Sequence, residues 1–192
     1  MAAQTESQRM IDALESDDWR ERFDATYALG MMSEEDNVLP LIRALDDPHE
    51  MIRGAAAGAL GVMRDPRAFE PLSKALKDPD KHVRMVAAAA LGETYDRLAV
   101  GPLIEALQDE EPGVRTAAIY ALGWLSDERA MPALLASLTD DCEHVRFLAA
   151  KAVANIWSPA AVEPLLPMIE SDDPAVRQEA SMLLSRRYRG ES

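Results

Sequence analysis

The chain has 192 residues, 48% of them hydrophobic, which is ample for a packed core and argues against disorder. Its 34 acids against 20 bases give a formal net charge of −14, which argues against nucleic-acid binding because phosphate recognition needs clustered Lys and Arg. A single cysteine excludes an internal disulfide framework, and no stretch resembles a signal peptide or membrane span, so we expect a cytoplasmic protein without membrane contact.

Two kinds of helix are expected to alternate along the chain. The first helix A runs from about Thr5 to Leu14, and later copies carry a proline in the first turn, where a missing N–H is tolerated. An Asp-rich turn follows, whose carboxylates favour the start of the next helix. Helix B then carries apolar residues at positions −1, 3, 6 and 7 relative to a recurring arginine, which form one stripe of an α-helix.

The recurring arginine returns every 31 residues, at Arg22, Arg53, Arg84, Arg115, Arg146 and Arg177. A fixed period of this length indicates stacked repeats, because one helix pair cannot bury its apolar stripe alone. Aspartates lie six residues before four of these arginines, at Asp47, Asp78, Asp109 and Asp140. We interpret both sets as a structural ladder of Asp and Arg hydrogen bonds along the stack rather than a ligand site.

Several strings carry a family resemblance: DPHEMIRGAAAGALG, DPDKHVRMVAAAALG, EEPGVRTAAIYALG, PRAFEPLSKALKD and LAVGPLIEALQD. They resemble HEAT-like repeats of the phycobilin lyase (PBS lyase) subtype, and the resemblance covers nearly the whole chain. It implies an armadillo-like helical fold in which helix A forms the convex side and helix B lines the concave side. It does not decide function, because the same repeat serves many unrelated roles.

We therefore predict an all-α fold, a right-handed α-solenoid (α-α superhelix) of six HEAT-like helix pairs that forms a single domain over residues 1–192. The terminal units are expected to differ because one side of each faces water, and Ser16 and Ser171 indeed stand where inner units have Asp. The expected repeats are about 5–33, 34–64, 65–95, 96–126, 127–157 and 158–188.

With the apolar stripe of helix B turned inward, positions −3, −2, 1, 2, 5 and 9 are expected to face outward. These positions hold aromatic and methionine side chains with nearly balanced charge, as protein-binding surfaces do, and small residues such as Gly54 and Gly58 predict a trough between them. The alternative is that the rings fold over their neighbours as extra core. The candidate partner-binding residues on the concave face are Trp19, Phe23, Tyr27, Met31, Met51, Met85, Tyr120, Trp124 and Phe147.

The sequence favours a non-enzymatic scaffold or adaptor that binds a partner helix or peptide in an apolar concave groove, as a monomer or in a hetero-complex and without a cofactor. The alternative implied by the resemblance is a subunit of a bilin lyase or a pigment-handling, chaperone-like factor. In that case Arg20 and Lys81 would meet the propionates of a bilin, and lyase-type chemistry would be the activity if the chain were an enzyme. A DNA glycosylase on HEAT-like helices would need a basic concave face, whereas this one is neutral.

No catalytic or metal site is predicted. The three histidines His49, His82 and His144 lie near turns, and the last two stand two units apart, so at 8–10 Å per stacked helix they are ~20 Å from each other and cannot share a metal. We therefore expect solvent-facing turn histidines. Cys142 precedes a helix start, but the acidic side chains around it oppose thiolate formation, which disfavours a nucleophile.

Overall fold

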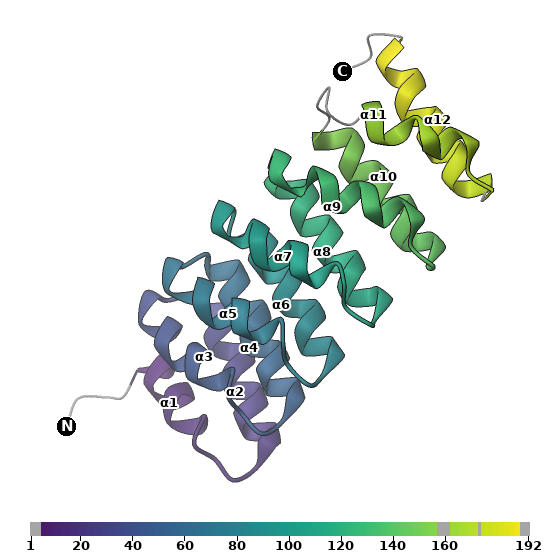
Figure 1. Cartoon of the computed structure of the whole chain (residues 1–192). Helices are drawn as coiled ribbons and strands as arrows, with labels where there is room; N and C mark the ends of the chain where they lie inside the picture. Colours follow the sequence, from purple (N-terminus) through teal and green to yellow (C-terminus); the bar gives the residue numbers. More distant parts are fainter. Residues whose placement is uncertain (1–4, 157–161, 173, 189–192) are drawn as a thin grey trace.

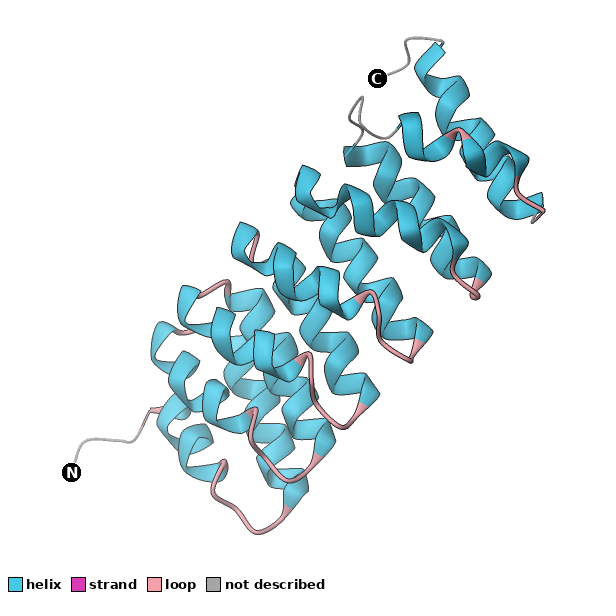
Figure 2. Ribbon diagram, viewed as in Figure 1, coloured by secondary structure: helices cyan, strands magenta, loops and turns pink. Residues whose placement is uncertain are grey.

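The computed structural model describes residues 5–156, 162–172 and 174–188, and every regular element within them is helical (Figure 2). The α-helices in chain order are α1 (Glu6–Ala13), α2 (Trp19–Met32), α3 (Val38–Ala44), α4 (Glu50–Met63), α5 (Phe69–Ala75), α6 (Lys81–Glu93), α7 (Val100–Ala106), α8 (Pro112–Leu125), α9 (Met131–Ala136), α10 (Glu143–Ile156), α11 (Val162–Leu165) and α12 (Pro174–Tyr188). Short 3-10 turns add η1 (Glu35–Asn37), η2 (Pro66–Ala68), η3 (Arg97–Ala99), η4 (Glu128–Ala130), η5 (Ser137–Thr139) and η7 (Pro167–Glu170).

These helices form the two layers of a solenoid (Figure 1). The even-numbered helices lie side by side in one layer, which we call the B layer, and each packs against the next. The odd-numbered helices form the A layer, and each packs against the even-numbered helix that follows it. The connecting loops run along the two long edges (Figure 2). The all-α solenoid predicted from the 31-residue period is confirmed.

The hydrophobic core lies between the two layers. Leu60, Leu91 and Leu122 of the B layer are fully buried at the predicted stripe, and Leu72 and Leu103 meet them from the A layer. Burying a leucine contributes about 2 kcal/mol, and because the core is continuous from repeat to repeat, each unit is stabilised by its neighbours. Within the part of the chain that the structure describes, no helix combines the length and apolarity needed to cross a bilayer.

Neighbouring B helices touch through glycine. A Cβ built on Gly61 would lie 2.7 Å from the Cα of Ala90, and one on Gly92 would lie 2.7 Å from the Cβ of Ala121. Both distances are shorter than any real carbon contact, so only hydrogen fits at these two positions. These small residues therefore set the separation of neighbouring B helices.

The end of each of the first four B helices is followed by a residue with positive φ that is not glycine. These residues also recur every 31 positions, at Ser33, Arg64, Tyr95 and Ser126, with φ between 47° and 55°. Left-handed backbone at a helix end allows the chain to reverse into the next A helix. The sequence pattern did not predict this feature, because glycine, its usual signal, is absent from all four positions.

Candidate partner-binding face and the arginine ladder

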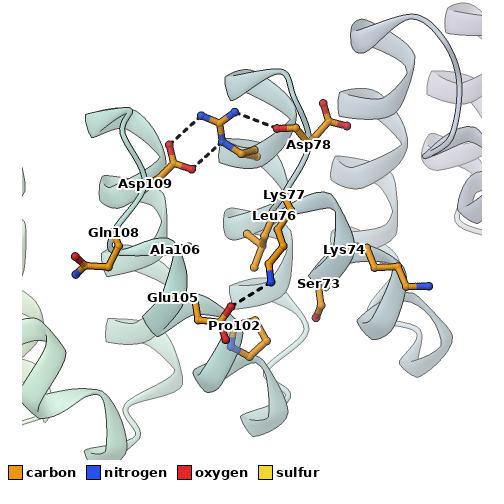
Figure 3. Close-up of a pocket in the computed structure, with 11 residues that line it drawn as sticks. Ser73, Lys74, Leu76, Lys77, Asp78, Pro102, Glu105, Ala106, Gln108 and Asp109 are labelled. Atoms are coloured by element: carbon orange, nitrogen blue, oxygen red, sulfur yellow. Dashed lines mark hydrogen bonds and ion pairs between the residues drawn. The ribbon is translucent and has the colours of Figure 1, made fainter.

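The recurring arginines join consecutive repeats in a ladder. Arg84 of α6 donates from Nε and Nη2 to the two carboxylate oxygens of Asp109 at 2.7 and 2.9 Å. Its Nη1 donates to the carbonyl oxygens of Asp78 and Pro79 at 3.0 and 3.3 Å, at the turn that precedes its own helix. The guanidinium thus ties two successive turns together, and Figure 3 shows Asp78 and Asp109 on either side of it. The same fork joins Arg22 to Asp47, Arg53 to Asp78 and Arg115 to Asp140.

Each ladder aspartate also holds its own turn. Asp109 accepts the backbone N–H of Glu111 at 2.9 Å, and the matching bonds recur at the other three rungs. Burial alone would raise the pKa of Asp109, but the hydrogen bonds from Arg84 and from the Glu111 N–H, together with the charge of Arg84, lower it below the ordinary value. The carboxylates therefore stay ionised and act as structural acceptors, not as proton donors or acceptors for a reaction.

The outer rungs differ from the inner ones. Nη1 of Arg146 and of Arg177 donates to turn carbonyls in the same way, but Ser171 replaces the aspartate that would face Arg146. At the first turn Ser16 takes the aspartate position, and its hydroxyl donates to Glu21 at 2.6 Å. These are the two serines that the sequence assigned to terminal units.

The ladder predicts a specific loss of stability in acid. A carboxyl whose pKa is lowered in the folded protein stabilises it above the ordinary pKa of about 3.9, and this contribution is lost as the pH falls through the lower folded value. The four ladder aspartates all have lowered pKa values, and hydrogen bonds from Arg129 lower the pKa of Asp127 to about 2. We expect a nearly constant melting temperature from pH 7 to about 5 and a fall below about pH 4. Thermal melts of the protein and of Asp78→Asn check this, because the variant should lose less stability below pH 4; equal losses would contradict it.

The B helices also present an apolar outer surface, which we call the B face. It consists of seven of the predicted partner-binding side chains, each between 36% and 70% exposed. Large exposed apolar patches on soluble proteins mark interaction sites, which makes these side chains the candidate contact residues. The B face is Tyr27, Met31, Met51, Met85, Tyr120, Trp124 and Phe147.

For Trp19 and Phe23 the prediction of an exposed side chain was wrong. Both are half-buried and pack against a small core cluster that includes Ile52. The Trp19 ring stacks on His49 with 4.2 Å between centroids, and the Arg20 guanidinium lies 4.8 Å from the centroid of the same ring. His49 and Ile52 both lie in the second repeat, so the two rings turn toward it. For Phe23 the extra-core alternative therefore applies, whereas Tyr27, Tyr120 and Phe147 stay exposed.

The prediction that position 2 after the recurring arginine faces outward is also wrong in two repeats. Ala117 and Leu148, which occupy it in repeats four and five, are buried. Each inner B helix is packed between two other B helices, so its buried arc is wider than the single stripe facing the A layer. A helical wheel of one repeat does not contain this lateral contact.

Family comparison decides what kind of chain this is. HEAT repeats match residues 7–92, 69–154 and 131–191, which together span almost the whole sequence. The chain belongs to the HEAT repeat family. No curated protein matches it.

Solved structures agree with that assignment. This HEAT repeat protein is similar to a chain of the complex of CpcE and CpcF of phycocyanin lyase from Nostoc sp. PCC7120, with 27% identity and a TM-score of 0.71, covering 93% of this chain and 76% of that one. It is also similar to an engineered protein (22% identity, TM-score 0.67, 95% and 98% covered). A designed armadillo repeat protein in complex with the peptide (KR)4 gives 21% identity and a TM-score of 0.65, covering 94% of this chain and 99% of that one. The last two show the fold alone, whereas the first supports the PBS lyase subtype.

The HEAT repeats also carry structural details that the sequence analysis missed. His49, expected to face solvent, is half-buried against Trp19, and its Nδ1 accepts the N–H of Met51 at the start of α4. Arg67 and Arg129 form a second set of bridges on the opposite edge, donating to the carbonyls of Glu35 and Arg97 one repeat earlier. The motif Asp-x-Arg at 65–67 and 127–129 was a visible signal for these bridges.

A cleft of about 590 Å³ lies between α5 and α7 of the A layer (Figure 3). Lys77 and Glu105 cross it with a 3.4 Å ion pair, and Arg84 and Asp109 close one end. Lys77 and Arg84 are paired with carboxylates, and a third cation, Lys74, also lines the cleft. It is a gap between consecutive turns, and it contains none of the B-face residues.

Proposed function

We propose that this HEAT repeat protein is a non-enzymatic scaffold whose B face binds a helix or peptide of a partner protein. The observation that carries the proposal is the exposure of the seven B-face side chains on the layer where the HEAT packing leaves the outer side uncovered. Aromatic and methionine side chains provide large contact area and adaptable packing at protein interfaces. The exposed rings are therefore the candidate binding hot spots.

The B face has two anchor points at the same repeat positions. Tyr27 and Met31 lie one helical turn apart in α2, and Tyr120 and Trp124 occupy the equivalent places in α8. Residues spaced i, i+4 share one side of a helix, so each pair forms a local apolar cluster. The two clusters stand three repeats apart, which at 8–10 Å per stacked helix is roughly 25–30 Å.

Small residues occupy the B helices between these anchors. Nothing lies within 4 Å of a Cβ built on Gly54, and Gly58 meets only Val86 at an ordinary 3.6 Å. The surface there is low and open to a partner backbone. An α-helix of roughly 17–20 residues, or an extended segment of about 8–9 residues, would span both anchors.

The cations near the B face are already occupied by other side chains. Arg20 lies over Trp19, Lys151 lies 5.4 Å from the centroid of the Phe147 ring, and Lys81 pairs with Glu111 at 3.3 Å. An apolar contact surface uses such side chains as a polar rim. This arrangement supports a polypeptide with apolar anchors more than a ligand that needs free cations.

The double variant Tyr120→Ser, Trp124→Ser tests the proposal. Both side chains are about half exposed, so the free energy of unfolding of the variant should lie within about 0.5 kcal/mol of that of the original protein. If each ring contributes about 2 kcal/mol as a hot spot, partner affinity should fall by a factor of about 100 or more. The measurement is parallel capture from the source cells, followed by titration of the captured partner. The control is Leu39→Ser, which replaces an exposed leucine on the A layer and should leave partner binding unchanged. Equal partner affinity of the original protein, the double variant and the control would refute the proposal.

A second candidate function is handling of a linear tetrapyrrole. The similarity to a chain of the phycocyanin lyase complex favours it. Arg20 and Lys81, the cations considered for its propionates, are engaged with Trp19 and Glu111, so both would have to leave their partners first. Mixing the protein with phycocyanobilin discriminates the two functions: a visible absorbance shift lost in Trp124→Ser favours the pigment, whereas an unchanged spectrum favours the scaffold.

A further inference from the structure

The boundary between α5 and α7, which we call the α5–α7 seam, is held together differently from the boundaries on either side of it. At the preceding boundary Arg67, just before α5, donates to the carbonyl oxygen of Glu35 one repeat earlier. At the following boundary Arg129, just before α9, donates to the carbonyl oxygen of Arg97 at 2.8 Å. The equivalent residue at the seam is Leu98, whose side chain has no donor and is 65% exposed. The bridge on this edge therefore forms at both neighbouring boundaries and cannot form at the seam.

The packing of α5 against α7 is also weaker than that of the neighbouring A helices. Ser73 of α5 occupies the position that Ile42 holds in α3 and Ile104 holds in α7. Both isoleucines pack against the hydrophobic core, whereas the Oγ of Ser73 is buried without a hydrogen-bond partner among the described residues. By contrast, the hydroxyl of Ser137 at the end of α9 donates to a carbonyl of its own helix at 3.1 Å. A buried hydroxyl without a partner weakens the contact that buries it.

The cleft described above lies at this seam (Figure 3). Ser73 lines it from α5, and Pro102 and Ala106 line it from α7. The ion pair that crosses it joins Lys77 to Glu105, whose side chains are 78% and 71% exposed, so it contributes little to stability. The two A helices can therefore separate or approach without breaking a strong contact.

The B layer is tightly joined across the same seam. A Cβ built on Gly92 of α6 would lie 2.7 Å from the Cβ of Ala121 in α8, so these two helices touch. Beside this contact Arg84 forks onto Asp109 at 2.7 and 2.9 Å, and the two side chains are only 10% and 12% exposed. The B side of the seam thus supplies a pivot, and the A side supplies the freedom to move.

We propose that the α5–α7 seam is a hinge about which the two parts of the solenoid rotate. A strong contact on one side of a boundary and a weak one on the other favour rotation over sliding of packed helices. Rotation that opens the cleft on the A side tilts the two parts toward each other on the opposite side, where the B face lies. Closing the cleft does the reverse.

The hinge gives the B face an adjustable spacing. The cluster of Tyr27 and Met31 lies on α2, before the seam, and the cluster of Tyr120 and Trp124 lies on α8, after it (Figure 1). Rotation at the seam therefore changes the distance between the two anchor points. This consequence rests on the function proposed for the B face, whereas the hinge itself does not.

Two matched pairs of spin labels test the hinge without any partner. Gln8, Leu39, Glu70 and Gly101 are exposed and occupy the same position on α1, α3, α5 and α7. Labels on Leu39→Cys with Gly101→Cys span the seam, and labels on Gln8→Cys with Glu70→Cys span as many repeats without it. Both pairs carry Cys142→Ser, and at 8–10 Å per stacked helix each separation is about 20 Å.

Double electron–electron resonance measures the distribution of each distance. We expect the pair that spans the seam to give a distribution about twice as broad as the other pair, because a weakly held boundary samples more orientations. Equal widths would overturn the hinge. Partner affinity does not enter this measurement, so its outcome is independent of the test of the B face.

Variants of the seam separate motion from simple filling of space. Ser73→Ile with Leu98→Arg copies the neighbouring boundaries, with the carbonyl of Pro66 as the acceptor equivalent to that of Glu35. It should narrow the seam-spanning distribution to the width of the control pair and raise the melting temperature by about 2–4 °C. Arg67→Leu removes the bridge between α3 and α5 and should broaden the control distribution. A higher melting temperature without narrowing in the first variant would refute the hinge, because the cleft would then be filled without any motion being restricted.

Discussion

Replacing Arg84 with methionine is expected to lower the free energy of unfolding by about 3 kcal/mol. The methionine keeps the length and apolar contacts of the side chain but removes the hydrogen bonds to the Asp109 carboxylate and those to the preceding turn. Asp109, whose side chain is 12% exposed, then loses its two charged donors, and the carbonyls of Asp78 and Pro79 lose theirs. A carboxylate left in a partly buried site without its partner is more destabilising than the intact pair is stabilising, which makes this effect large.

Lys77→Met is the matched control for that substitution. Lys77 pairs with Glu105 across the same two repeats, but the two side chains are 78% and 71% exposed, so the change should be below about 0.5 kcal/mol. Arg84→Lys should fall between the two, because an ammonium keeps the charge but cannot form the planar fork. Urea unfolding followed by circular dichroism measures all three. If Arg84→Met lowers the free energy of unfolding as little as Lys77→Met does, the ladder is a surface feature without a structural role.

Two glycines of one helix should respond to alanine with opposite signs. In α4, a Cβ at Gly61 would collide with the backbone of Ala90, so Gly61→Ala should destabilise the protein by about 1–3 kcal/mol through overpacking. Gly54 lies seven residues earlier with nothing within 4 Å of its Cβ. Gly54→Ala should therefore stabilise the protein by about 0.5–1 kcal/mol, the ordinary gain of alanine over glycine in a helix.

The comparison of these two variants isolates packing between repeats from helix propensity. Both changes add one methyl group to the same helix, so propensity contributes equally, and only the neighbouring helix differs. Differential scanning calorimetry of the two single variants and the double variant measures the effects and their additivity. A gain in stability from Gly61→Ala would show that the B helices can separate without loss, which contradicts the glycine contact.

The fold could be predicted from the sequence because the 31-residue period of a solenoid determines where its helices and its core lie. Arg84 and its equivalents located every B helix, and the leucines of the stripe located the core, since each repeat packs only on its neighbours. The 3-10 turns and the left-handed residue at Tyr95 did not follow. Such local geometry depends on how the chain must reverse between layers, and residue type at these positions gave no signal of it.

The candidate site was predictable only in part. Tyr120 and Trp124 lie outward as a single-helix wheel implies, because that wheel describes the side of the helix away from all packing. Leu148 and Phe23 did not follow, since their burial comes from an adjacent repeat rather than from their own helix. Lateral contacts of this kind need the separation between helices, which the glycine contacts set and the period alone does not give.

The most direct test of the binding face is hydroxyl-radical footprinting of the protein with and without its captured partner. Methionine, tryptophan, tyrosine and phenylalanine side chains all oxidise readily, so protection of the B face can be measured on the unsubstituted protein. We expect oxidation of Met31, Tyr120 and Trp124 to slow several-fold in the complex, while Leu39 on the A layer continues to react at its free rate. Unchanged oxidation of the three B-face residues, with slowing at Leu39 instead, would contradict the proposed scaffold.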